Sequence, residues 1–311
     1  MKNFLTLLLI VSIAFSAVPA EAASKAKTPT LSNVEAATVN LYCRIKLGGR
    51  TLNSTGSGVF ISDRGVILTN AHVGQYFLMN SGSGKSTSNC VIRTGSPAKD
   101  QYTASVLYIS PQWLNDFAIS VDEKQASSGS GRADFALLYV TGSKKGKLPE
   151  KFPAVPIADA QSIMTLPVGE EVSISGYPAE KLSYKSILEK LVLLTASSSI
   201  TETRSFDRPF TDILVLAPSK AGQQGVSGGP VARTSGEVVG IVTTTGDSTS
   251  KGMRSIRAVS IVHMNRIAVA DTGLVFPLLY AGDLATRAKL TESAFTFDVR
   301  AMLEKRIRQI R

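Results

Sequence analysis

The sequence is short of the residues that most metal, redox and nucleic-acid sites need. Its 311 residues include two histidines, two cysteines and one tryptophan, and aromatic residues make up 7%. No H-E-x-x-H or C-x-x-C pattern occurs, so neither a usual zinc site nor a cofactor is expected. With few aromatic side chains to stack on bases and no recognition module, specific nucleic-acid binding is not predicted either.

Long apolar runs are also missing, except near the N-terminus. There an apolar run over residues 4–15 follows Lys2 and leads to the small residues Ala20-Glu21-Ala22. A spanning helix needs about 20 apolar residues, which this run does not reach. The layout is that of a cleaved secretory signal, so residues 1–22 are predicted to be a signal peptide and the protein to be secreted or periplasmic.

Export changes how the two cysteines are interpreted. In an oxidising compartment an isolated pair is expected to form a disulfide, so Cys43 and Cys90 are predicted to be joined. The bridge would close a loop that contains His72, and in the chain-entropy model such a loop contributes on the order of 4 kcal/mol. Two buried free thiols are the alternative.

The charge balance is basic. The formal net charge is +10, with 34 Lys and Arg against 24 Asp and Glu, and Lys2 and Glu21 cancel within the predicted signal. A weak electrostatic association with an anionic cell surface is compatible with this charge. The hydrophobic content of 43% excludes a largely disordered chain.

Short strand-like segments separated by glycine-rich turns dominate the chain and favour barrels. The first set is predicted at residues 39–45, 58–62, 66–69, 90–93, 103–109 and 135–140, and the second at 171–175, 191–196, 213–217, 229–232, 238–243 and 255–261. The predicted organisation is a leader with a short helix capped at Ser32 (23–37), a first barrel (38–142), a linker (143–154), a second barrel (155–262) and a helical extension (263–311).

The extension ends in a helical pattern. Val299, Met302, Leu303, Ile307 and Ile310 recur at helical spacing among basic residues, which predicts an amphipathic helix. Its apolar face is expected to pack on the domain. Binding to a membrane surface through the basic face is the alternative.

Three further segments carry the chemistry, in the order His, Asp, Ser. His72 follows Thr69-Asn70-Ala71, Asp134 precedes an apolar strand, and Ser227 lies between glycines in the segment 225–230. A serine hydroxyl is a poor nucleophile, so acyl-transfer enzymes place an imidazole beside it and a carboxylate behind the imidazole. The amides of Gly225 and Ser227 would then form an oxyanion hole.

Each partner of the serine has one competitor. Asp116 also precedes Phe-Ala, but Asp134 opens the longer apolar strand and is favoured. His263 is the second histidine, and it lacks the Thr-Asn-Ala-His setting of His72. His72 is therefore the predicted general base.

These three segments resemble those of the trypsin-like serine peptidases, more closely the secreted bacterial and HtrA-type branch than the digestive enzymes. The resemblance covers roughly residues 38–262. It implies an all-β fold of two six-stranded antiparallel barrels and a serine endopeptidase that acts on protein or peptide substrates. No PDZ-like module is expected after the terminal helix.

The resemblance also implies where substrate would bind. The residue six before the serine, at the base of the primary pocket, is Ala221, and the strand that pairs with substrate backbone would be Thr243-Thr244-Thr245. Val226 stands where the animal enzymes of the family have the aspartate that pairs with a new N-terminus. Activation by that route is therefore not expected.

Two other classes of protein remain open. The segment 225–229 also satisfies G-x-S-x-G, so an α/β-hydrolase esterase using Asp247 and His263 is the first. That fold needs a helix directly after the serine, and Gly228-Gly229-Pro230 is a poor helix start. A catalytically inactive binding protein on the same fold is the second.

Overall fold

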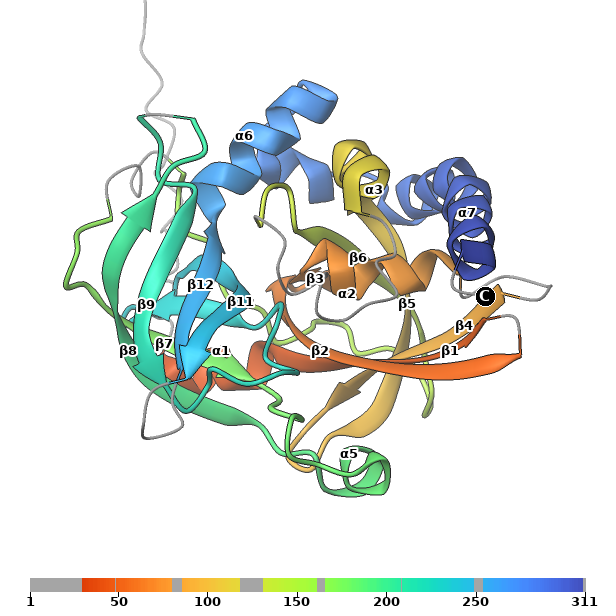
Figure 1. Cartoon of the computed structure of the whole chain (residues 1–311), viewed down its shortest axis with the longest axis horizontal. Helices are drawn as coiled ribbons and strands as arrows, with labels where there is room; N and C mark the ends of the chain where they lie inside the picture. Colours follow the sequence, from red (N-terminus) through yellow and green to blue (C-terminus); the bar gives the residue numbers. More distant parts are fainter. Residues whose placement is uncertain are drawn as a thin grey trace, which may run out of the picture.

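The computed structural model describes residues 30–47, 49–79, 86–117, 131–160, 166–207, 209–248 and 254–309. The predicted signal peptide lies outside the described residues. The described chain forms two antiparallel β-barrels side by side, with helices gathered mainly on one face (Figure 1).

The first barrel closes in the order β1-β2-β3-β6-β5-β4. Its strands alternate or are wholly apolar, so their inward side chains fill the barrel; β3, for example, is buried along its whole length. The strands are β1 (Thr38–Leu47), β2 (Arg50–Ser62), β3 (Val66–Thr69), β4 (Ser86–Thr94), β5 (Lys99–Ile109) and β6 (Ala136–Ser143).

The second barrel closes in the order β10-β11-β12-β9-β8-β7. Its strands are β7 (Glu171–Gly176), β8 (Leu194–Arg204), β9 (Ile213–Ser219), β10 (Pro230–Arg233), β11 (Val238–Ser248) and β12 (Arg254–Ser260). Two closed six-stranded antiparallel barrels followed by a C-terminal helix confirm the predicted fold class.

Some element boundaries differ from the predictions. β8 begins at Leu194 instead of residue 191, because Leu191 packs in a small separate cluster with Tyr177. The first helix, α1 (Leu31–Ala37), is capped by Thr30, whose N–H donates to Asn33 Oδ1 at 3.0 Å. The predicted cap at Ser32 is therefore wrong.

Short helices join the strands. The sequence did not predict them, since each is shorter than the window that helical periodicity requires. They are α2 (Ala71–Gly74), η1 (Gln75–Met79), α3 (Pro111–Phe117) and α5 (Tyr184–Lys190).

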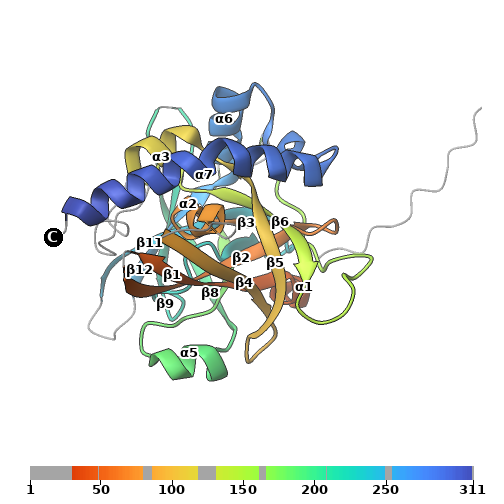
Figure 2. The ribbon, with the colours of Figure 1, turned by 90° about the vertical axis from the view of Figure 1, so that its right-hand side faces the viewer.

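The C-terminal extension covers one face of the molecule (Figures 1 and 2). It consists of α6 (Ile261–Thr272), η2 (Phe276–Tyr280) and α7 (Leu284–Gln309), and α7 lies along β5. Leu284 and Ala288 of α7 are buried, and Thr291 Oγ1 donates to Leu107 O at 3.0 Å. The first turns of α7 thus pack on the first barrel. The side chains of residues 296–300 and 302–309, which include the predicted apolar-face residues Val299, Met302, Leu303 and Ile307, lie outside the described part of the helix.

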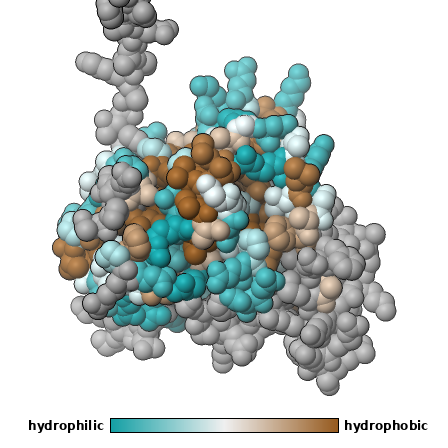
Figure 3. Space-filling view, turned by 90° about the horizontal axis from the view of Figure 1, so that it is seen from above, coloured by the Kyte–Doolittle hydropathy of each residue, from teal (hydrophilic) through white to brown (hydrophobic). Residues whose placement is uncertain are grey.

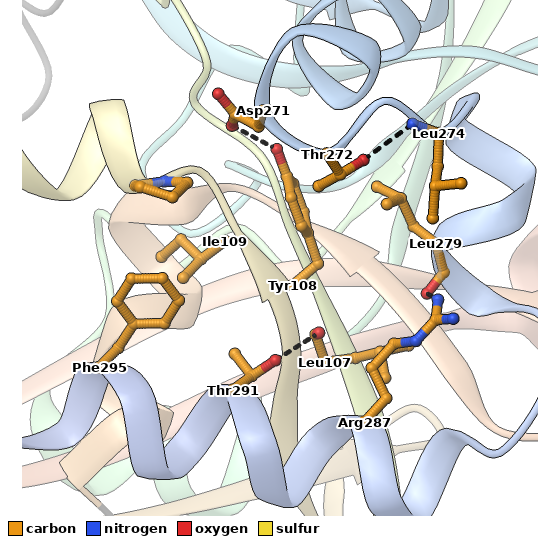
Figure 4. A pocket seen from close by; sticks show the side chains of 11 residues that line it. Leu107, Tyr108, Ile109, Asp271, Thr272, Leu274, Leu279, Arg287, Thr291 and Phe295 are labelled. Atoms are coloured by element: carbon orange, nitrogen blue, oxygen red, sulfur yellow. Dashed lines mark hydrogen bonds between the residues drawn. The ribbon is translucent and has the colours of Figure 1, made fainter.

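A cavity of about 320 Å³ remains between β5, α6 and α7 (Figure 4). Its lining is mostly apolar, and Tyr108 bridges it by donating its hydroxyl to Asp271 Oδ2 at 2.7 Å. The molecule seen from above Figure 1 shows apolar and polar side chains mixed on its surface (Figure 3).

Within the described residues, no helix is both long and apolar enough to cross a membrane.

The structure joins Cys43 and Cys90, which are directly opposite on β1 and β4 with Cα atoms 4.0 Å apart. Replacing both cysteines by alanine is expected to lower the free energy of unfolding by about 2–4 kcal/mol, because the unfolded chain regains freedom. Urea denaturation of the double variant beside the unreduced wild type measures this. Peptide mass spectrometry without reduction is the control, and alkylation of both thiols in unreduced protein would contradict the bridge.

Candidate active site

Neighbouring strands bring His72 and Asp134 together. His72 lies in α2, directly after β3, and Asp134 lies two residues before β6. β3 and β6 pair with Thr69 opposite Ala136, so the end of one strand faces the beginning of the other. Asn70 ties the two segments by donating its Nδ2 to the carbonyl of Asp134 at 2.9 Å.

The carboxylate of Asp134 is held by three donors. His72 Nδ1 lies 2.9 Å from Asp134 Oδ2, and the backbone N–H of His72 donates to Oδ1 at 3.0 Å. From the second barrel, Thr243 Oγ1 donates to Oδ2 at 2.6 Å. A carboxylate fixed in this way keeps the Nδ1–H tautomer of the imidazole and leaves Nε2 free to accept a proton.

Burial and charge act in opposite directions on this pair. Burial by itself would lower the pKa of His72, but the charge of Asp134 and the hydrogen bond to it outweigh burial, so the pKa is raised above its usual value. Burial would raise the pKa of Asp134, but His72 and the hydroxyl of Thr243 hold it below its usual value. The site therefore favours an ionised aspartate beside a basic imidazole.

The serine segment fits directly against the histidine segment. A side chain at Gly228 would overlap the carbonyl of Ser57 and the hydroxyl of Thr69, three residues before His72. Ser57 N donates to the carbonyl of Ser227 at 2.8 Å. Only glycine allows this approach, and its φ of 84° at residue 228 also requires it. The close fit brings Ser227 to the same seam as His72.

The hydroxyl of Ser227 points toward Thr243 on β11. Its Oγ lies 3.4 Å from Thr243 O, and within the described part of the chain no hydrogen bond joins it to the imidazole. Such contacts are often long in unliganded enzymes and tighten when substrate binds.

Hydrogen bonds from two neighbouring segments hold the backbone around Gly225. The carbonyl of Gln224 accepts from Ala179 N at 2.8 Å, so the Gly225 N–H, on the opposite side of the same peptide, points away from that contact. Ser57 Oγ donates to the Gly225 carbonyl at 2.7 Å. Among the described residues, no hydrogen bond is found from the amides of Gly225 or Ser227.

The other candidate residues are placed as follows. Ala221 is buried in the turn before the serine, where its carbonyl accepts from Gln223 N at 2.8 Å. Thr244 is buried on β11, and Thr245 follows it on the same strand, where its backbone pairs with Ile256. Asp116 is exposed on α3, away from the pair that Asp134 forms with His72.

His263 is not placed as a free base. Both its ring nitrogens are engaged, Nδ1 with Asp212 at 2.9 Å and Nε2 with the N–H of Ala133 at 3.2 Å. The serine is followed by β10 instead of a helix. Two barrels and an occupied His263 exclude the α/β-hydrolase alternative; the side chain of Asp247 lies outside the described residues.

Two features of the site were missed by sequence reasoning. Thr243 was predicted only as part of a substrate-pairing strand, whereas its hydroxyl also binds Asp134. The pairing of His263 with Asp212 was not anticipated at all. Neither carries a local sequence signal, because both depend on how distant strands are aligned.

Comparisons with known proteins identify a family for this chain. Residues 56–241 match the family model of the trypsin-like peptidase domain. A search of the curated proteins found no match. Solved structures that are similar include the active form of the Rv3671c protease from M. tuberculosis, at 18% identity, a TM-score of 0.47, and coverage of 86% of this chain and 96% of that chain.

The HtrA-type protease AlgW with a decapeptide is also similar, at 16% identity, a TM-score of 0.48, and coverage of 78% of this chain and 67% of that chain. The family model alone spans more than half of the sequence, and it includes the histidine, aspartate and serine segments described above. The chain belongs to the trypsin-like peptidase family.

Proposed function

We propose that the protein is an exported serine endopeptidase that cleaves peptide bonds through Ser227, His72 and Asp134. The observation that carries the proposal is the Asp134 carboxylate, held between His72 Nδ1 and the hydroxyl of Thr243, with the Ser227 segment packed against the same seam. The apolar run at residues 4–15 supports export.

The reaction would follow from this geometry. Ser227 Oγ attacks the peptide carbonyl carbon while its proton passes to His72 Nε2, and Asp134 stabilises the resulting imidazolium. The oxygen that becomes negative would be bound by the amides of Gly225 and Ser227. The imidazolium then gives its proton to the departing amine, which leaves an acyl-enzyme. Water, deprotonated by the same imidazole, attacks the acyl carbonyl carbon, and the imidazolium returns that proton to Ser227 Oγ as the bond to the serine breaks and the acid product leaves.

Labelling with a fluorophosphonate tests the proposal. The wild type is expected to form one adduct, on Ser227, because only an activated serine reacts rapidly. The His72→Ala variant is expected to lose the adduct, while Asp116→Asn, on the exposed α3, is expected to keep it. Labelling that survives His72→Ala would refute the triad, and a wild type that is never labelled would favour an inactive binding protein.

Small to medium apolar or polar side chains are expected at the cleaved residue. Ala221 offers no carboxylate to a lysine or arginine side chain that loses its water on entering. Glu180, near this turn, is already paired with Arg254 at 2.8 Å. A peptide library measures the preference. Cleavage mainly after lysine or arginine would overturn it, and an Asp247→Ala variant would then show whether that carboxylate supplies the charge.

A further inference from the structure

The molecule contains a second, fully buried histidine–aspartate pair. The side chains of His263 on α6 and Asp212 before β9 are 1% and 0% exposed, with Nδ1 and Oδ1 2.9 Å apart. His263 Nε2 accepts the backbone N–H of Ala133 at 3.2 Å. Because a backbone N–H can only donate, Nε2 carries no proton and Nδ1–H must point at Asp212. This pair therefore has a fixed tautomer.

Asp212 is itself fixed from several sides. Arg266 Nη1 donates to Oδ1 at 2.7 Å, and the N–H of Phe206 donates to Oδ2 at 2.6 Å. The Arg266 guanidinium also lies 4.0 Å from the centre of the Phe210 ring. The carboxylate cannot turn without breaking these bonds, so it orients His263 rigidly.

Ala133, the residue that His263 holds, directly precedes Asp134. It has φ 55°, and it is the one residue other than glycine with positive φ in the described chain. This conformation is unfavourable for alanine and persists only where the surroundings enforce it. Ala133 is 1% exposed, so without His263 its N–H would be buried and unsatisfied.

The residue after Asp134 is held by the same C-terminal segment. The Phe135 ring packs edge-on against Phe276 of η2, with centroids 5.7 Å apart. It also stacks on Tyr108, with ring centroids 5.5 Å apart. The hydroxyl of Tyr108 in turn binds Asp271 at the end of α6, as Figure 4 shows. Asp134 is thus bracketed by two contacts that lead to residues 261–280, beyond the part that matches the family model.

We propose that His263 is a positioning residue for the reaction: oriented by Asp212, it fixes the backbone of Ala133 and thereby the direction from which the Asp134 carboxylate meets His72. The inference rests on the proposed function, since it assigns a role relative to that triad. It makes α6, which lies after the second barrel, part of the catalytic apparatus of the first.

The rate of fluorophosphonate labelling of Ser227, followed against pH, tests this role. His263→Leu removes the acceptor for Ala133 and is expected to slow labelling by up to about a hundredfold, the cost of a misplaced catalytic group. The acid limb of the profile is expected to move to lower pH, because a displaced Asp134 no longer raises the pKa of His72. His263→Gln offers both a donor and an acceptor and is expected to restore most of the rate and the limb.

The matched control is Met264→Ala, which opens a cavity beside His263 on the same helix. Met264→Ala is expected to lower the melting temperature while leaving the acid limb of the labelling profile at its wild-type pH. If Ser227 in His263→Leu is labelled at the wild-type rate, His263 has only a structural role and the proposal falls. The same holds if labelling is slower but the acid limb of its pH profile has not moved.

A measurement that needs no activity covers the case in which His263→Leu does not fold. In the Ser227→Ala protein, ¹⁵N NMR is expected to show His263 Nε2 unprotonated and hydrogen-bonded, and the Ala133 amide protected from exchange. A protonated Nε2 or a rapidly exchanging amide would overturn the proposal. If NMR shows the hydrogen bond between the Ala133 amide and His263 Nε2 but the wild-type protein is never labelled by fluorophosphonate, the proposed function is refuted. The contact between His263 and Ala133 would still stand.

Discussion

Replacing Ser227 by alanine is expected to lower the rate of peptide hydrolysis by about a millionfold, to the level that binding and the oxyanion amides alone support. His72→Ala is expected to cost about as much. The double variant should lose little more, because serine and base act as one unit. Single-turnover assays on a peptide amide measure all three.

The fold is expected to survive these changes. Ser227 and His72 are half-buried at the seam between the barrels and contribute little to either core. Circular dichroism and the melting temperature provide the control. Hydrolysis by Ser227→Ala at a rate comparable to the wild type would end the assignment.

Changing Asp134 to asparagine is expected to lower kcat by about ten-thousandfold. The amide of asparagine can donate to His72 Nδ1, which places the imidazole proton on Nε2 and blocks it as a base. In the wild type, activity falls as the pH drops through the raised pKa of His72. Without the carboxylate charge that pKa drops, because burial then acts alone, and the acid limb moves to lower pH.

The matched control is Asp116→Asn, which changes the competing Asp-Phe-Ala segment on the exposed surface of α3. Its kcat and its pH profile are expected to equal those of the wild type. A loss of activity in Asp116→Asn combined with an active Asp134→Asn would contradict the choice of carboxylate. Rate measurements over a pH series on both variants decide between these outcomes.

The two barrels could be predicted from the sequence because the strands alternate and glycine turns separate them. The contact between His72 and Asp134 was predicted from the nature of the two segments, and the pairing of β3 with β6 explains it. Their catalytic roles, like that of Ser227, stay predictions.

The rest depends on alignment between distant strands. Three threonines follow one another on β11, and nothing local says that Thr243 is the one whose hydroxyl reaches Asp134. Thr243 lies where the register of β11 against β12 shifts, between Val242 and Thr244. Asp212 and His263 are separated by 51 residues and meet only because β9 and β12 pair. Sequence spacing contains no such information.

Ser57 of β2 joins the first barrel to the loop before Ser227. Its hydroxyl donates to the Gly225 carbonyl and accepts from Tyr177 N at 2.9 Å, so a strand of the first barrel secures the loop that carries the proposed oxyanion amides of the second. Any loosening of the two halves would release that loop while each barrel is still intact. A partly opened molecule would therefore lose the arrangement of the proposed oxyanion amides before either barrel unfolds, and it is expected to be inactive.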